Sequence, residues 1–486
     1  MSSKNGKILI ILLFAIFSSL GYSLLAPLYP FEAKERDIGE SMIGVIFSSF
    51  AFSNFLFIAA APKLIKLIGK NDLLIMSLLI EGCCTCWFGL ISFLNNKHLF
   101  LVISFVLRIM QGVGAALLQT IIYSVTAGFS CKEEIEKNIG YIEIGEAIGL
   151  AIGPIFASFG HYFFGFIFPF LFAGFLELCG IALVSKLEIE GLKEDDYDDE
   201  YSESSSSSEE ETLANSEVKN EMTVHNFNSK TKVKNEERIC DNLVGSVKYS
   251  NEFLDNFDIE GNKKVGVLNI IINVKVLAIF FGCFCDQVSD GFIMPVFAEF
   301  LTDRYKFKQE QTSFFFMIST CTYFISLQFL NIITSKLNNR KTIGIGWVFN
   351  SFFILFLGPD SLFPQSYTLT ILGLTFMGCA SCLITVPAVI ELINIIKEDF
   401  AISEDEANDN ASAIFNFGYT LGASVGPLYG GFLCEKYGFV KANRYNCLTS
   451  STFFVFYLVV MLLNLYKRKG SKMEGKRLSV LSVGIK

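Results

Sequence analysis

Runs of about 20 apolar residues recur along the whole chain, and they limit its possible fold more than any other feature. A helix of that length crosses the apolar part of a lipid bilayer. Charged residues make up only 18% of the chain, against 52% hydrophobic residues, whereas soluble domains carry roughly 25% charged residues. The sequence therefore predicts an all-α membrane protein with 12 transmembrane helices.

The predicted helices form two groups of six, separated by one polar stretch. The first group is placed at 8–28, 42–61, 73–94, 99–123, 139–159 and 163–187. The second group is placed at 267–301, 312–334, 343–357, 367–396, 411–434 and 448–466. We accordingly expect an N-terminal six-helix bundle (1–187), a linker (188–265), a C-terminal six-helix bundle (266–467) and a tail (468–486).

The linker differs from the rest of the chain in composition. It is rich in Ser, Asn and Lys, and residues 188–222 hold 14 acidic and 2 basic side chains. Since such a segment cannot bury a core, we expect a disordered loop, and favour a solvated spacer over a phosphorylated switch. The net charge of −9 comes from this loop, so it describes no partner surface and gives no indication of nucleic-acid binding.

One motif, G-x-x-x-G-x-x-x-G-P, occurs in both halves. Glycines four residues apart line one face of a helix and let another backbone approach closely, and the closing proline bends the helix. Two copies with the same spacing indicate an internal duplication rather than a generic packing helix. The residues expected to serve helix packing or gating are Gly145, Gly149, Gly153, Pro154, Gly418, Gly422, Gly426 and Pro427. A looser echo pairs Ala26-Pro27 with Met294-Pro295.

Lysine and arginine are more frequent in the loops after even-numbered helices, and in the tail, than on the opposite side. Positively charged loops stay in the cytoplasm, so both termini and the linker are predicted to be cytoplasmic. Most cysteines lie within apolar runs and have no metal-binding spacing with the three histidines. We therefore expect no disulfide framework, no metal and no cofactor.

Ionisable residues inside the predicted helices are the candidates for substrate or proton binding, because a charge at the bilayer centre costs roughly 3 kcal/mol. These candidates are Arg108 in the fourth helix, Glu143 and Glu146 in the fifth, Asp286 and Asp290 in the seventh, and Glu391 in the tenth. Arg108 and a glutamate of the fifth helix could equally form a structural ion pair. Asp290 and Glu391 have no basic neighbour in sequence, which favours function. Glu81 and Glu177 lie nearer the expected helix ends.

Several of these features together resemble the major facilitator superfamily. They are the two six-helix halves, the long middle loop, Arg108-Ile-Met-Gln-Gly-Val-Gly114, and the glycine–proline motif of the fifth helix, which is associated with antiporters there. Four stretches are more similar to the vesicular amine transporters, especially their polyamine branch. They are 22–33, 43–47, Ile384-Thr-Val-Pro-Ala-Val-Ile-Glu391 and 426–438.

The resemblance implies that two bundles rock around a central cavity, while protons drive cationic amines across the membrane. Asp290 and Glu391 match the family's intramembrane acids, Arg108 its arginine in the fourth helix, and Glu143 a glutamate of the polyamine branch. A buried carboxylate has a raised pKa and can exchange a proton for a cation.

Some residues depart from the family pattern. Asn416 and Ser18 stand where the monoamine branch has aspartates, which argues against a catecholamine or serotonin carrier. Asn54 stands where the polyamine branch has an acid. Asn54 and Asn416 nevertheless remain candidate substrate-binding residues by position.

Three functions fit the sequence. The first is a proton-coupled antiporter of organic cations, polyamine-like or monoamine-like, in a vesicular or other endomembrane, or in the plasma membrane. The second is a uniporter or symporter for another small solute, and the third a non-transporting membrane protein. An enzyme would need a nucleophile or metal cluster at a membrane face, and the sequence shows neither. The expected partners are a small organic cation, protons and the lipid bilayer, with the protein acting as a monomer.

Overall fold

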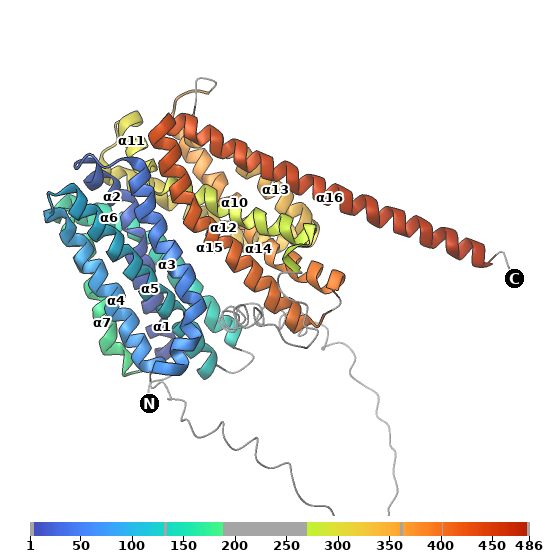
Figure 1. Cartoon of the computed structure of the whole chain (residues 1–486), viewed down its shortest axis with the longest axis horizontal. Coiled ribbons are helices and arrows are strands. Elements are labelled where there is room, and N and C mark those ends of the chain that lie inside the picture. Colours follow the sequence, from blue (N-terminus) through green and yellow to red (C-terminus); the bar gives the residue numbers. More distant parts are fainter. Residues whose placement is uncertain (1–3, 131–133, 188–269, 360–362, 401, 484–486) are drawn as a thin grey trace, which may run out of the picture.

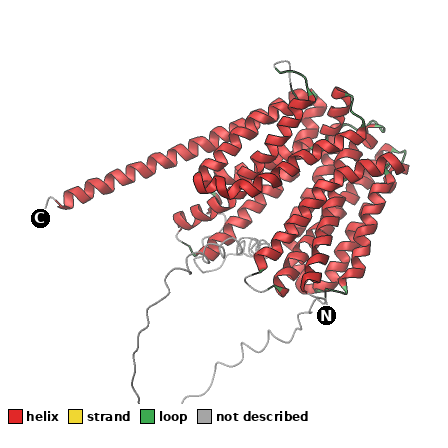
Figure 2. Cartoon of the chain, turned by 180° about the vertical axis from the view of Figure 1, so that it is seen from behind, coloured by secondary structure: helices red, strands yellow, loops and turns green. Residues whose placement is uncertain are grey.

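The computed structural model describes residues 4–130, 134–187, 270–359, 363–400 and 402–483. In these residues the chain is helical, with no strand (Figure 2). Ten of the described helices are long and apolar enough to cross a membrane. The prediction of an all-α membrane protein is confirmed. The linker at 188–265 lies outside the described residues, so the prediction for it stays a prediction.

The helices form two bundles that lie side by side, coloured blue to green and yellow to red in Figure 1. The N-terminal bundle contains α1 (Lys4–Ser23), α2 (Leu25–Lys34), α3 (Glu40–Ile68), α4 (Lys70–Leu90), α5 (Lys97–Phe129), α6 (Ile135–Phe164) and α7 (Ile167–Val184). The C-terminal bundle contains α10 (Val274–Ile293), α11 (Phe297–Tyr305), α12 (Gln309–Lys336), α13 (Asn339–Phe353), α14 (Tyr367–Phe400), α15 (Glu404–Tyr437) and α16 (Phe439–Val483).

Two of the predicted helices are each divided into two pieces. The first becomes α1 and α2, and the seventh becomes α10 and α11. Pro27 lies just after the first break and Pro295 lies within the second, and a proline lacks the N–H that would bond the carbonyl four residues earlier. The breaks fall at equivalent places in the two halves, which agrees with the internal duplication.

The helices α13 and α15 occupy the ninth and eleventh predicted positions. α13 has only 15 residues, and α15 begins with the polar stretch Glu404–Asn410, so neither meets the length and hydropathy expected of a span. The candidate span in the last helix ends at Asn464, close to the predicted end at 466, while α16 itself continues without interruption to Val483. Its final part projects far beyond the bundle (Figure 1).

The glycine–proline motif brings equivalent helices together in each half. A Cβ added at Gly149 of α6 would lie 2.5 Å from the carbonyl oxygen of Ile16 in α1. A Cβ at Gly422 of α15 would lie 2.3 Å from the carbonyl oxygen of Phe284 in α10. Both glycines are therefore needed for direct contact between backbones. The helix-packing role predicted for the motif agrees with this geometry.

The two bundles contact each other through α3 with α15 and α6 with α12. A Cβ at Gly44 would lie 2.3 Å from the carbonyl oxygen of Pro427, and the Ser158 and Ser313 hydroxyls form a hydrogen bond. The backbone N–H of Ser41 donates to Glu435 Oε2 over 2.7 Å. These contacts lie toward the end that carries α2 and α11, opposite the N-terminus in Figure 1.

Candidate functional site

Asp286 and Asp290 lie one helical turn apart on α10, as the sequence predicts. Asp286 is buried, and its Oδ2 accepts a 2.7 Å hydrogen bond from the Ser381 hydroxyl of α14. Asp290 is half-buried and lies nearer the break before Pro295. The two carboxylates interact electrostatically with each other, so the site concentrates negative charge in the C-terminal bundle.

Arg108 is buried in the middle of α5, with only 1% of its surface exposed. Its Nη1 donates to Gln111 Oε1 over 3.1 Å, and its guanidinium lies 4.4 Å from the centre of the Phe50 ring and 5.6 Å from that of Tyr22. Aromatic faces attract a cation. The sequence also allowed an ion pair between Arg108 and a glutamate of the fifth helix. In the structure, Arg108 instead contacts Gln111, Phe50 and Tyr22.

Tyr22 of α1 lies between the two charged groups. It interacts electrostatically both with Arg108 of its own bundle and with Asp290 of the other bundle. Its ring also lies 4.9 Å from that of Phe50. Tyr22 therefore connects the arginine of one half to the acid of the other at the boundary between the bundles.

Two further tyrosines line this boundary. Tyr419 of α15 interacts electrostatically with Asp290, Asp286 and Tyr22. The Tyr323 hydroxyl of α12 lies 3.4 Å from Thr385 Oγ1 and also interacts with Asp286. Sequence reasoning gave no role to any of the three tyrosines. They could have been noticed as tyrosines within apolar helices, because a buried phenol hydroxyl needs a polar partner.

Glu143 and Glu146 lie on α6. Glu143 is exposed and interacts electrostatically with Tyr323 of the other bundle. Glu146 is half-buried, and its Oε1 accepts a 3.4 Å hydrogen bond from Gln119 Nε2. Glu143 thus belongs to the boundary between the bundles, whereas Glu146 is engaged inside the N-terminal bundle.

Glu391 has a partner that its sequence surroundings do not reveal. Arg340, at the start of α13, donates from Nε to Glu391 Oε1. Tyr457 of α16 holds the backbone of Arg340 through a 3.0 Å hydrogen bond to its carbonyl oxygen. Glu391 is ten residues beyond Ser381 on α14, which is about 15 Å along a helix. The structure therefore does not bring Glu391 to Asp286 and Asp290.

Asn54 of α3 and Asn416 of α15 lie where the bundles face each other. Each asparagine precedes a phenylalanine, and the rings of Phe55 and Phe417 are 5.4 Å apart across this boundary. Asn54 is half-buried and Asn416 is exposed. Both residues are therefore placed near the interface between the bundles.

Glu81 and Glu177, placed near helix ends by the sequence, are instead buried in the middle of α4 and α7. Glu81 Oε1 accepts a 2.6 Å hydrogen bond from Ser18, and Glu177 Oε2 accepts a 3.3 Å bond from Thr85. Gln111 donates to the same Thr85 over 3.0 Å. A polar network thus runs from Glu177 through Thr85 and Gln111 to Arg108.

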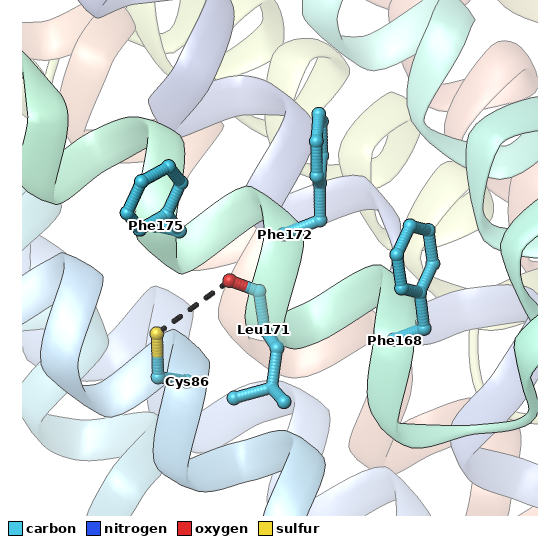
Figure 3. A pocket seen from close by; sticks show the side chains of 5 residues that line it. All are labelled: Cys86, Phe168, Leu171, Phe172 and Phe175. Carbon is cyan, nitrogen blue, oxygen red and sulfur yellow. Dashed lines mark hydrogen bonds between the residues drawn. The ribbon is translucent and has the colours of Figure 1, made fainter.

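An apolar pocket of about 380 Å³ lies between α4 and α7 (Figure 3). It is lined by Cys86, Phe168, Leu171, Phe172 and Phe175, and Cys86 donates from Sγ to the Leu171 carbonyl oxygen over 3.7 Å. Its lining carries no charged side chain that could neutralise an organic cation or bind a proton. The charged residues between the bundles form the better candidate site.

The family model of the Major Facilitator Superfamily matches residues 11–224 and 279–482. The chain therefore belongs to this superfamily of membrane transporters.

Relatives in sequence support this membership and agree with the resemblance drawn from the sequence. MFS-type transporter SLC18B1 of Rattus norvegicus is 21% identical over 422 residues, which cover 86% of this chain and 78% of that protein. The Homo sapiens protein of the same name is 22% identical over 87% of this chain and 78% of its own length. Multidrug resistance protein 2 of Bacillus subtilis (strain 168) is 30% identical over 38% of this chain and 44% of its own length.

Solved structures show the same fold. A bacterial homolog of the human lysosomal transporter Spinster aligns with a TM-score of 0.65 at 10% identity, over 94% of this chain and 97% of that chain. The nucleoside transporter NupG aligns with a TM-score of 0.62 at 12% identity, over 93% and 98% of the two chains. This similarity concerns the fold alone.

Proposed function

We propose that the protein is a proton-coupled antiporter of organic cations that works by alternating access. The observation that carries this proposal is the position of Tyr22, which interacts with Arg108 of one bundle and Asp290 of the other. Acidic groups at the boundary between two moving bundles are suited to bind a cation and release it on the other side.

The acids supply the coupling. Asp286 and Asp290 lie in a low-dielectric environment next to Tyr22, Tyr323 and Tyr419. A carboxylate in such a place binds either a proton or a cationic amine, because an ionised carboxylate without a positive partner is costly in a low-dielectric environment. Tyrosine rings add an attractive surface for a cation. A proton arriving from the acidic side would then displace the amine.

Alternating access requires that the contacts at the α2 and α11 end open and close. The lysine and arginine bias favours an orientation in which this end faces away from the cytoplasm, with both termini and the linker on the cytoplasmic side. We place the protein in a vesicular or other endomembrane as a monomer, since one chain carries both halves of the proposed site.

The test is uptake of labelled amines into proteoliposomes with an imposed pH gradient. Wild-type protein should accumulate a polyamine only when the lumen is acidic, and Asp290→Asn should abolish this accumulation. Asp72→Asn, an exposed aspartate at the start of α4, is the matched control and should behave as wild type. Equal uptake with and without the gradient would instead support a uniporter.

A further inference from the structure

Two buried glutamates of the N-terminal bundle have no part in the proposed transport chemistry. Glu81 is 3% exposed and Glu177 is 0% exposed. One carboxyl oxygen of each accepts a hydrogen bond, from Ser18 and Thr85 respectively. The other oxygens, Glu81 Oε2 and Glu177 Oε1, have no hydrogen-bond partner among the described residues. An unsatisfied polar atom at this depth calls for an explanation.

Neighbouring helices close tightly over both groups. A Cβ at Gly21 of α1 would lie 2.5 Å from Glu177 Oε1, and a Cβ at Gly114 of α5 would lie 3.0 Å from Glu81 Cβ. Both glycines thus allow a helix to pack directly onto a glutamate. The two carboxyl groups are enclosed between α1, α4, α5 and α7.

The charges around the pair do not balance two ionised carboxylates. Arg108 of α5 interacts electrostatically with Glu81, and its Nε and Nη2 have no hydrogen-bond partner in the described part of the chain. The other titratable groups in range are the Cys84 and Cys86 thiols of α4, near Glu177, together with Tyr22 and Tyr29, near Arg108. Within the described residues, one positive charge therefore faces two carboxyl groups.

We propose that Glu81 and Glu177 bind one proton between them and form a proton site inside the N-terminal bundle. The proton neutralises one carboxyl group and gives it an O–H donor, while the other carboxylate balances Arg108. Burying a second unpaired carboxylate would be far more costly than binding a proton from water.

This site is connected to the boundary between the bundles. Arg108 interacts with Glu81 on one side and with Tyr22 on the other, and Tyr22 interacts with Asp290. When the proton leaves, the N-terminal network gains a negative charge, which offsets part of the positive potential of Arg108 at Tyr22. The presence or absence of this proton in the N-terminal bundle thereby changes the electrostatic potential at Asp290 in the C-terminal bundle.

The test is the infrared carbonyl band of protonated carboxylic acids in the purified full-length protein at neutral pH. Glu81→Gln and Glu177→Gln should each remove one carboxylic acid per protein from this band, because the remaining carboxylate then balances Arg108. Arg108→Gln should add one, because both glutamates are then protonated. The exposed Glu35 provides a control, and Glu35→Gln should leave the band unchanged. An unchanged band in both single glutamate variants would overturn the proposal.

Thermal unfolding provides a second readout. Each single glutamine variant leaves a neutral network and should fold with little loss of stability. The double variant Glu81→Gln/Glu177→Gln leaves Arg108 unbalanced and should melt at a lower temperature, and adding Arg108→Gln should restore stability. If both single variants failed to fold, the shared proton would be contradicted. Neither readout depends on transport, so a failure here leaves the antiport proposal to its own uptake test.

Discussion

Lys34, the last residue of α2, forms an ion pair with Glu299 of α11 and so joins the two bundles at one end of the molecule. Asp303 adds a second carboxylate 3.3 Å from the same ammonium group. The Lys34 side chain is 52% exposed, so the pair is weakened by solvent and contributes only about 0.5 kcal/mol. In the proposed alternating-access cycle, this ion pair would favour the arrangement in which this end is closed.

Reversing the charge at this contact should shift that balance. We expect Lys34→Glu to widen the distance distribution between spin labels placed at the tips of α2 and α11 in a cysteine-free background. The swap Lys34→Glu/Glu299→Lys should bring the distribution back toward wild type, because it restores opposite charges. An identical distribution in all three proteins would show that the ion pair does not hold this end closed.

The Arg340–Glu391 pair predicts a different phenotype from that of Asp290. Glu391 is buried but Arg340 is 22% exposed, and removing the glutamate leaves the arginine without this hydrogen-bond acceptor, so we expect Glu391→Ala to lower the free energy of unfolding by about 2 kcal/mol. Arg340→Ala/Glu391→Ala should recover part of this loss. After correction for folded protein, Glu391→Gln should keep pH-driven uptake, whereas Asp290→Asn should lose it. Loss of uptake in a well-folded Glu391→Gln protein would show that Glu391 takes part in proton coupling.

The glycine motif predicts a large effect from a single methyl group. A Cβ at Gly149 would lie 2.5 Å from a backbone oxygen, whereas a Cβ at Gly140 of the same helix meets nothing within 4 Å among the described residues. Gly149→Ala should therefore reduce the yield of folded protein and the melting temperature in detergent, while Gly140→Ala should leave both unchanged. Equal behaviour of the two variants would show that α6 can move away from α1 at little cost.

The orientation can be tested at Asn410-Ala-Ser412, which precedes the apolar part of α15. The positive-inside bias predicts that this sequon faces the cytoplasm, where it would not be glycosylated. We expect no shift in apparent mass after glycosidase treatment of protein made in a eukaryotic host. An inserted segment with a sequon between α13 and α14 should be glycosylated. A glycan on Asn410 would invert the topology.

Deleting most of residues 190–262, while leaving a flexible span, should preserve both thermal stability and amine uptake. The composition of this segment cannot support a core, and its predicted role is that of a spacer. Thermal unfolding and uptake of the deletion variant, measured beside the full chain, check this. A marked loss of stability would mean that the segment packs against the bundles.

Local patterns predicted most of the fold, because each transmembrane helix is determined by its own apolar run. The glycine motif even indicated which face of α6 and α15 meets another backbone. Charge partners were harder to predict, since Arg340 and Glu391 are 51 residues apart in sequence and meet only when α13 packs on α14. Glu81 and Glu177 were misplaced for a related reason. Helix ends are hard to locate within long apolar runs, so the sequence did not indicate how deep these two glutamates lie within their helices.

The backbone contacts made by Gly149 and Gly422 restrict how the molecule can deform. α6 lies against α1, and α15 against α10, with no side chain between them at these points, so neither pair can slide or separate without breaking its contact. Each pair is therefore a rigid lever with one member facing the opposite bundle, since α6 also contacts α12 and α15 also contacts α3. A rearrangement that keeps both backbone contacts must therefore move α1 with α6, and α10 with α15, as two units against the opposite bundle.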